Sequence, residues 1–74
     1  MPGLPALSGR KVVKVFKSFG WEVVRQRGSH IILVKENHNA TLSVPDHKEV
    51  AKGTLRSLIR AAGIPVEEFI KVAK

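Results

Sequence analysis

The side chains in this sequence best suited to chemistry are histidines, and one of them stands among cations. His30 follows Gly28 and Ser29, two small residues that let a phosphate backbone come close, and Arg25 and Arg27 lie just before them. An imidazole exchanges protons near neutral pH, and a cation stabilises negative charge on a phosphate. These two functions suffice for RNA cleavage, because the 2′-hydroxyl of RNA supplies the nucleophile and the imidazole acts as general base or acid. The products would carry a 2′,3′-cyclic phosphate and a 5′-hydroxyl.

The other candidate groups are weaker, and from spacing alone an ordinary surface histidine stays an alternative even for His30. His38 has turn residues around it and is expected to be plain surface. His47 lies between a predicted strand and a predicted helix, where it could assist as an acid. Ser29 is a second assisting residue, but strand neighbours point to opposite faces, so a serine hydrolase that pairs it with His30 is not expected.

Several other kinds of site are disfavoured by composition. The chain has no cysteine, which rules out thiol nucleophiles, disulfides and thiolate metal ligands. Its six acidic residues are scattered and form no carboxylate pair, and its three histidines lack zinc-binding spacing. We therefore expect neither a metal nor a cofactor.

The charge of the chain predicts a polyanionic partner. Thirteen Lys and Arg against six Asp and Glu give a net charge of +7. A second basic cluster stands where a helix is expected to begin, and helix N-termini offer free N–H groups to phosphates. A solvated polar face opposite an apolar stripe is the alternative reading of that cluster. The residues expected to contact RNA are Arg25, Arg27, Lys35, Lys48, Lys52, Thr54 and Arg56.

The elements that must position these residues follow from capping and periodicity. Ser8 is a good N-cap for a helix that ends at Gly20, and Thr54 is expected to cap a second helix that ends at Gly63. Residues 21–27, 30–35 and 40–44 have strand composition, with Pro45 closing the third strand. A short last helix is expected to start at Pro65.

This order predicts an α+β fold in one domain, residues 1–74. The expected architecture is a two-layer sandwich, α-β-β-β-α(-α), in which a three-stranded antiparallel sheet carries its helices on one face. Trp21 is expected in the core rather than on a base-stacking surface. No apolar run approaches the length of a membrane span and no signal-peptide segment is recognised, so a cytoplasmic protein is expected.

Motifs in this order also resemble a known family. Gly28-Ser29-His30 is followed by Pro45 with His47 two positions later, and then by Gly53-Thr54-Leu55, Leu58-Ile59 and Ala62-Gly63-Ile64. Over residues 8–70 the chain resembles the HicA-type toxins, small messenger-RNA-cleaving proteins of toxin–antitoxin systems. Their fold is similar to the double-stranded-RNA-binding domain.

The resemblance implies a function in the stress response of the cell. It implies a metal-independent endoribonuclease whose catalytic histidine is His30. It also implies that a HicB-type antitoxin inhibits the enzyme by covering this residue. The toxin would be a monomer when free and part of a hetero-oligomer with the antitoxin.

Two other classes of function remain open from the residues themselves. The chain could be a non-catalytic module that grips duplex RNA through Lys48, Lys52 and Arg56. It could also bind DNA or an acidic protein through a second helix that carries Arg56 and Arg60. The three hypotheses differ in whether the protein cleaves RNA, binds RNA without cleaving it, or does not bind RNA.

Overall fold

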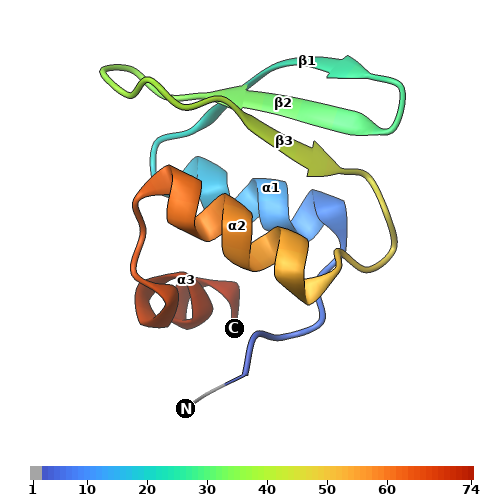
Figure 1. The fold of residues 1–74 in the computed structure, drawn as a ribbon, viewed down its shortest axis with the longest axis vertical. Helices are drawn as coiled ribbons and strands as arrows, with labels where there is room; N and C mark the ends of the chain where they lie inside the picture. The colour runs from blue at the N-terminus through green and yellow to red at the C-terminus, as the bar shows by residue number, and fades with distance from the viewer. Residues whose placement is uncertain (1–2) are drawn as a thin grey trace.

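An antiparallel sheet lies over a pair of helices, and a further helix lies beneath that pair (Figure 1). The computed structural model describes residues 3–74. Its strands follow the order β1-β2-β3, each antiparallel to the next, which confirms the expected α+β class. The elements are α1 (Gly9–Ser18), β1 (Glu22–Arg27), β2 (His30–Val34), β3 (Leu42–Pro45), α2 (Lys52–Ala62) and α3 (Val66–Ala73).

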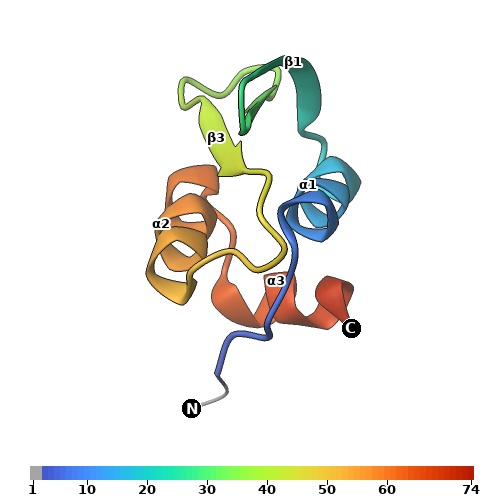
Figure 2. The same ribbon diagram turned by 90° about the vertical axis from the view of Figure 1, so that its right-hand side faces the viewer.

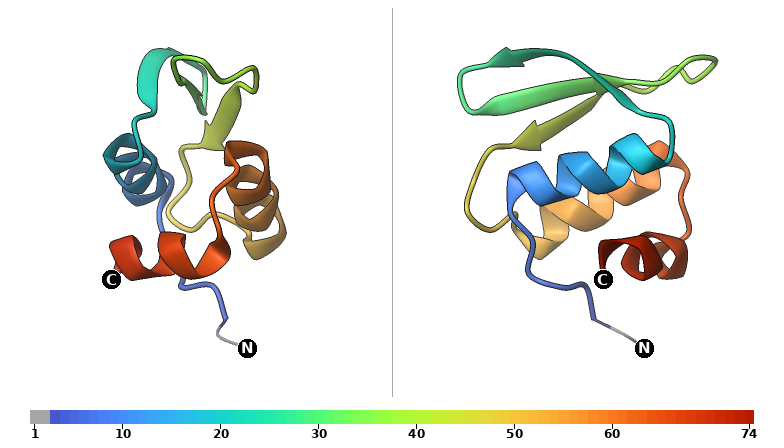
Figure 3. Two further views of the ribbon diagram at one scale, coloured as in Figure 1. Left: turned by 90° about the vertical axis from the view of Figure 1, so that its left-hand side faces the viewer. Right: turned by 180° about the vertical axis from the view of Figure 1, so that it is seen from behind.

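The helices are not all in one layer. Figures 2 and 3 show α1 and α2 side by side under the sheet, with α3 crossing below both on the side away from it. Phe69 of α3 is fully buried and its ring lies 5.2 Å from that of Phe16 in α1. The expected sandwich of sheet and helices is therefore present, with α3 added as a third layer.

The first helix has the ends that its sequence predicts. The Ser8 Oγ accepts a hydrogen bond from the Lys11 N–H at 3.1 Å, as an N-cap does. Gly20 follows the C-cap with φ 97°, a conformation that favours glycine. Gly9, at the start of α1, is so close to β3 that a Cβ there would collide with the carbonyl oxygen of Pro45. The start of α1 therefore packs directly against the end of β3.

The predicted cap of the second helix is wrong. α2 begins at Lys52 with Ala51 as its N-cap and no side-chain cap, while Thr54 is an exposed residue of the first turn. The reason is long-range: Val50 is buried and its N–H donates to the Leu7 carbonyl at 2.8 Å. This bond fixes the backbone at Val50, and α2 begins two residues later, before Thr54.

The core lies between the sheet and the helices. Trp21 is 1% exposed, as predicted. The centroid of its ring lies 6.4 Å from that of Phe16, and the two rings meet edge to face. The inner face of the sheet supplies Leu33 from β2 and Val44 from β3. By contrast every residue of β1 is exposed, so this edge strand lies outside the covered part of the sheet.

Candidate active site

His30 is the first residue of β2 and lies on the open face of the sheet. The burial pattern of β2 alternates, so that Ile31 and Leu33 face the helices while His30 is exposed. A two-residue turn precedes it, in which Gly28 has φ 58° and supplies the backbone conformation that a tight hairpin needs. The hairpin thus places the imidazole at a corner that a large substrate can reach.

Two arginines of β1 share this open face with His30. The antiparallel register pairs Arg27 with His30 and Arg25 with Ile32. Directly opposed residues point to the same face of a sheet, with their Cβ atoms about 5 Å apart. A bulge between Val23 and Arg25 shifts the register of β1 so that both arginines align in this way. The sheet therefore places the His30 imidazole and two cations on one face, which closeness in the sequence alone did not establish.

A serine that sequence reasoning missed completes the group. Ser43 of β3 is exposed, and its Oγ lies 3.3 Å from the Nδ1 of His30. Arg27, Gly28, His30, Ile32 and Ser43 line an open hollow of about 580 Å³. The alternation of residues 40–44 put Ser43 on the outer face, but its place beside His30 depends on the β2–β3 register.

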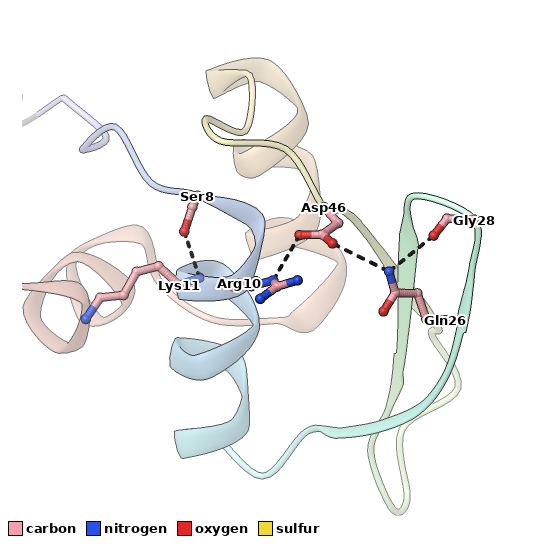
Figure 4. Close-up of polar contacts among 6 residues, drawn as sticks. All are labelled: Ser8, Arg10, Lys11, Gln26, Gly28 and Asp46. Atoms are coloured by element: carbon pink, nitrogen blue, oxygen red, sulfur yellow. Dashed lines mark hydrogen bonds and ion pairs between the residues drawn. The ribbon is translucent and has the colours of Figure 1, made fainter.

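Asp46 ties this corner to the rest of the fold (Figure 4). Its carboxylate lies 3.5 Å from the Nε of Arg10 in α1 and accepts a 3.5 Å hydrogen bond from the Gln26 amide. The same amide donates to the Gly28 carbonyl, and the Asp46 N–H donates to the Ser29 carbonyl at 2.6 Å. The hairpin turn is thus held against both α1 and the chain that leaves β3.

Further basic residues lie at the same end of the molecule. Figure 1 shows the β1–β2 turn, the connection 46–51 and the starts of α1 and α2 on one side. Lys48 in that connection and Lys52 at the start of α2 are exposed there, whereas Arg56, also exposed, lines a hollow with Arg60 and Ile64 further along α2. His47 is exposed there too, and its carbonyl accepts the Gly9 N–H at 2.9 Å. We call this side the hairpin end.

Lys35 does not join this group. It follows the other end of β2, five residues from His30, which corresponds to about 16 Å along a strand. Its Cε would lie 3.3 Å from a Cβ placed on Gly20, so its stem covers that turn. Its predicted contact with RNA near His30 would need a substrate that spans the sheet.

His38 also lies at this second end, and it is not plain surface. It is half-buried, with its ring 4.9 Å from that of Trp21, and its Nδ1 accepts the Ala40 N–H at 3.2 Å. We call the side formed by Trp21, Lys35 and His38 the Trp21 end. Its histidine is part of the packing.

Within residues 3–74 no group of three or more His, Cys, Asp or Glu side chains is placed to hold a metal ion. The helices described there are also too short or too polar to cross a membrane.

Comparison with known proteins identifies the family. The family model for the HicA toxin of bacterial toxin–antitoxin systems matches residues 9–64, most of the chain. The chain belongs to the HicA toxin family. A solved structure titled as a toxin–antitoxin complex from Streptococcus pneumoniae contains a chain with 29% identity and a TM-score of 0.70. The match covers 78% of this HicA-family chain and 98% of that chain. The search of curated proteins found no match.

The HicA match has a defined extent. It includes His30, the hairpin turn and the start of α2, and it ends before α3. The third layer is thus an addition outside the matched family region, whereas all the candidate site residues lie inside it.

Proposed function

We propose that this HicA-family protein is the toxin of a toxin–antitoxin pair and cleaves messenger RNA with His30 as its catalytic residue. The observation that carries the proposal is the exposed imidazole on the open sheet face, opposite Arg27 and beside Ser43. His38, which packs against Trp21, is half-buried instead.

The chemistry follows from the positions of these groups. His30 takes the proton of a 2′-hydroxyl, and the 2′-oxygen attacks the adjacent phosphorus in line with the leaving 5′-oxygen. Arg27 and Arg25 stabilise the charge that develops on the phosphate oxygens. His47, exposed at the hairpin end, assists by protonating the leaving oxygen, and Ser29 assists by contacting the phosphate from the turn. No step requires a metal.

The hairpin end would also hold the RNA backbone. Lys48 and Lys52 are exposed between β3 and the first turn of α2, and Arg56 adds an exposed cation one turn further along that helix. Phosphate contacts of this kind give affinity without reading sequence, and they weaken as salt increases. Thr54, exposed in the first turn of α2, adds a hydroxyl donor there, while Lys35 would engage only RNA that continues to the Trp21 end.

The partner proposed for this toxin is a HicB-type antitoxin in the cytoplasm. The similar chain from Streptococcus pneumoniae comes from a toxin–antitoxin complex, which supports such a pair. An antitoxin that places acidic groups over Arg27 and His30 would exclude RNA from the hollow. The free toxin would be a monomer, and the inhibited form a hetero-oligomer.

Incubation of end-labelled RNA with purified protein tests the proposal. The wild type should cut RNA in EDTA and leave 2′,3′-cyclic phosphate and 5′-hydroxyl ends. His30→Ala should lose about 10²- to 10⁴-fold in rate, the usual contribution of a general base, while its melting temperature stays unchanged. Equal cleavage by both proteins, or 3′-hydroxyl products, would contradict the assignment.

A non-catalytic duplex-RNA-binding module is the second candidate function. The exposed cations around the start of α2 favour it, because they form a surface that does not need His30. It predicts salt-sensitive binding of duplex RNA by the wild type and by His30→Ala alike, with no strand scission.

A further inference from the structure

We infer that Ser43 is a positioning residue for His30: its hydroxyl oxygen accepts a hydrogen bond from Nδ1–H and so leaves Nε2 as the nitrogen that meets the RNA. This inference rests on the proposed function and names a residue that the sequence reasoning did not place in the site.

The contact joins two strands whose backbones are fixed. Ser43 pairs with Ile32 in the β2–β3 ladder, and His30 pairs with Pro45 two positions further along. The Oγ of Ser43 reaches the Nδ1 of His30 diagonally at 3.3 Å. An exposed histidine at the start of a strand can turn between rotamers, so an anchor on a rigid neighbouring strand restricts where its ring lies.

The direction of the bond determines the state of the ring. If Nδ1 carries the proton and donates to Ser43, Nε2 keeps a lone pair and can act as a base. After Nε2 takes a proton from the 2′-hydroxyl, Nδ1 still donates, so Ser43 accepts in both halves of the proton cycle. In the opposite tautomer, with Ser43 donating to Nδ1, Nε2 would carry a hydrogen and could not take one. The proposal requires the first arrangement.

Packing gives no reason for a serine at this place. Its neighbours Leu42 and Val44 are buried in the core, whereas the Ser43 side chain is exposed and lines the same hollow as Arg27 and His30. An exposed hydroxyl on an edge strand contributes little to stability. Loss of this hydroxyl should therefore affect catalysis and leave folding intact.

The test compares Ser43→Ala, Ser43→Thr and, as a matched loss of an exposed hydroxyl two residues earlier, Thr41→Ala. Steady-state cleavage of a labelled RNA should show kcat about tenfold lower in Ser43→Ala, with KM and melting temperature unchanged, since one orienting hydrogen bond is lost. Ser43→Thr should restore most of kcat, because it returns a hydroxyl at the same place. Thr41→Ala should match the wild type.

A fourth variant, Ser43→Asp, gives a readout that a purely structural role would not move. A carboxylate beside Nδ1 stabilises the protonated imidazole, so the rising limb of the pH–rate profile should shift to higher pH. An unshifted limb would overturn the proposed contact.

The outcomes separate this inference from the proposed function. If Ser43→Ala keeps the wild-type kcat while His30→Ala is inactive, the positioning role is wrong and the nuclease stands. If Ser43→Ala raises KM and leaves kcat unchanged, Ser43 contacts RNA instead and the inference is again overturned. If His30→Ala cuts RNA like the wild type, the proposed function itself fails.

Discussion

The two ends of the sheet each hold a histidine, in opposite settings. At the hairpin end His30 is exposed on the open face, opposite Arg27 and in contact with Ser43. At the Trp21 end His38 is half-buried against an aromatic ring, and its Nδ1 is used by the backbone. The same residue type thus serves as a candidate proton-transfer group in one place and as a packing group in the other.

The difference shows what decides the role of a lone histidine. Both residues stand beside turns in the sequence, and both have a hydrogen-bonded Nδ1. They differ in what lies around the ring: cations and a hollow around His30, and Trp21 around His38. The surroundings of the ring in the folded chain therefore separate the candidate catalytic imidazole from the one that packs in the fold.

The largest expected effect on stability is at the Trp21 end. Trp21→Ala should destabilise the fold by about 3–5 kcal/mol, because it empties a fully buried site. A domain of this size rarely has more than about 3–5 kcal/mol of stability, so urea denaturation should show a much earlier midpoint or no folded baseline. Val24→Ala, at an exposed site three residues later, should change the free energy of unfolding by less than about 0.5 kcal/mol. Equal effects would mean that the Trp21 end does not anchor the core.

A smaller effect should separate the cations of the two ends. Arg27→Ala should weaken RNA binding several-fold and lower the salt dependence by about one phosphate contact, because Arg27 lines the hollow. Lys35→Ala removes the same charge from the Trp21 end and should change the binding of a short RNA less. Fluorescence anisotropy at several salt concentrations, with an RNA too short to span the sheet, measures the affinity of both variants and its salt dependence. A greater loss of affinity in Lys35→Ala than in Arg27→Ala would mean that the RNA binds at the Trp21 end, which contradicts the proposed site.

The smallest expected effects compare two helix starts near the hairpin end. Ser8→Ala removes a side-chain cap and should lower the unfolding free energy by about 1 kcal/mol. Thr54→Ala should change it by less than about 0.5 kcal/mol, since Thr54 caps nothing. Matching losses in denaturant titrations would show that Thr54 caps α2 in solution after all.

The sequence predicted the elements and the local features of the site, because both depend on short-range rules. The cap at Ser8, the glycines at the ends of two helices and the hairpin turn before His30 are read from neighbours in the chain. That Arg27 stands opposite His30 is known from the register of the two strands in the structure.

The features that sequence reasoning missed all depend on contacts between distant segments. Thr54 has the right type for a cap, but the bond from Val50 to Leu7 sets the helix start. Ser43 meets His30 only through the β2–β3 register, and His38 meets Trp21 only when the sheet is formed. Periodicity in one segment cannot specify such pairings, which arise from tertiary packing.

The most direct test of the account measures cleavage rate and melting temperature side by side for His30→Ala and His38→Ala. His30→Ala should lose at least about 100-fold in rate at an unchanged melting temperature. His38→Ala should keep most of the rate, measured well below its midpoint, and lose about 1–2 kcal/mol of stability as its ring packing and backbone hydrogen bond disappear. The reverse pattern, with cleavage lost in His38→Ala and retained in His30→Ala, would contradict the central claim.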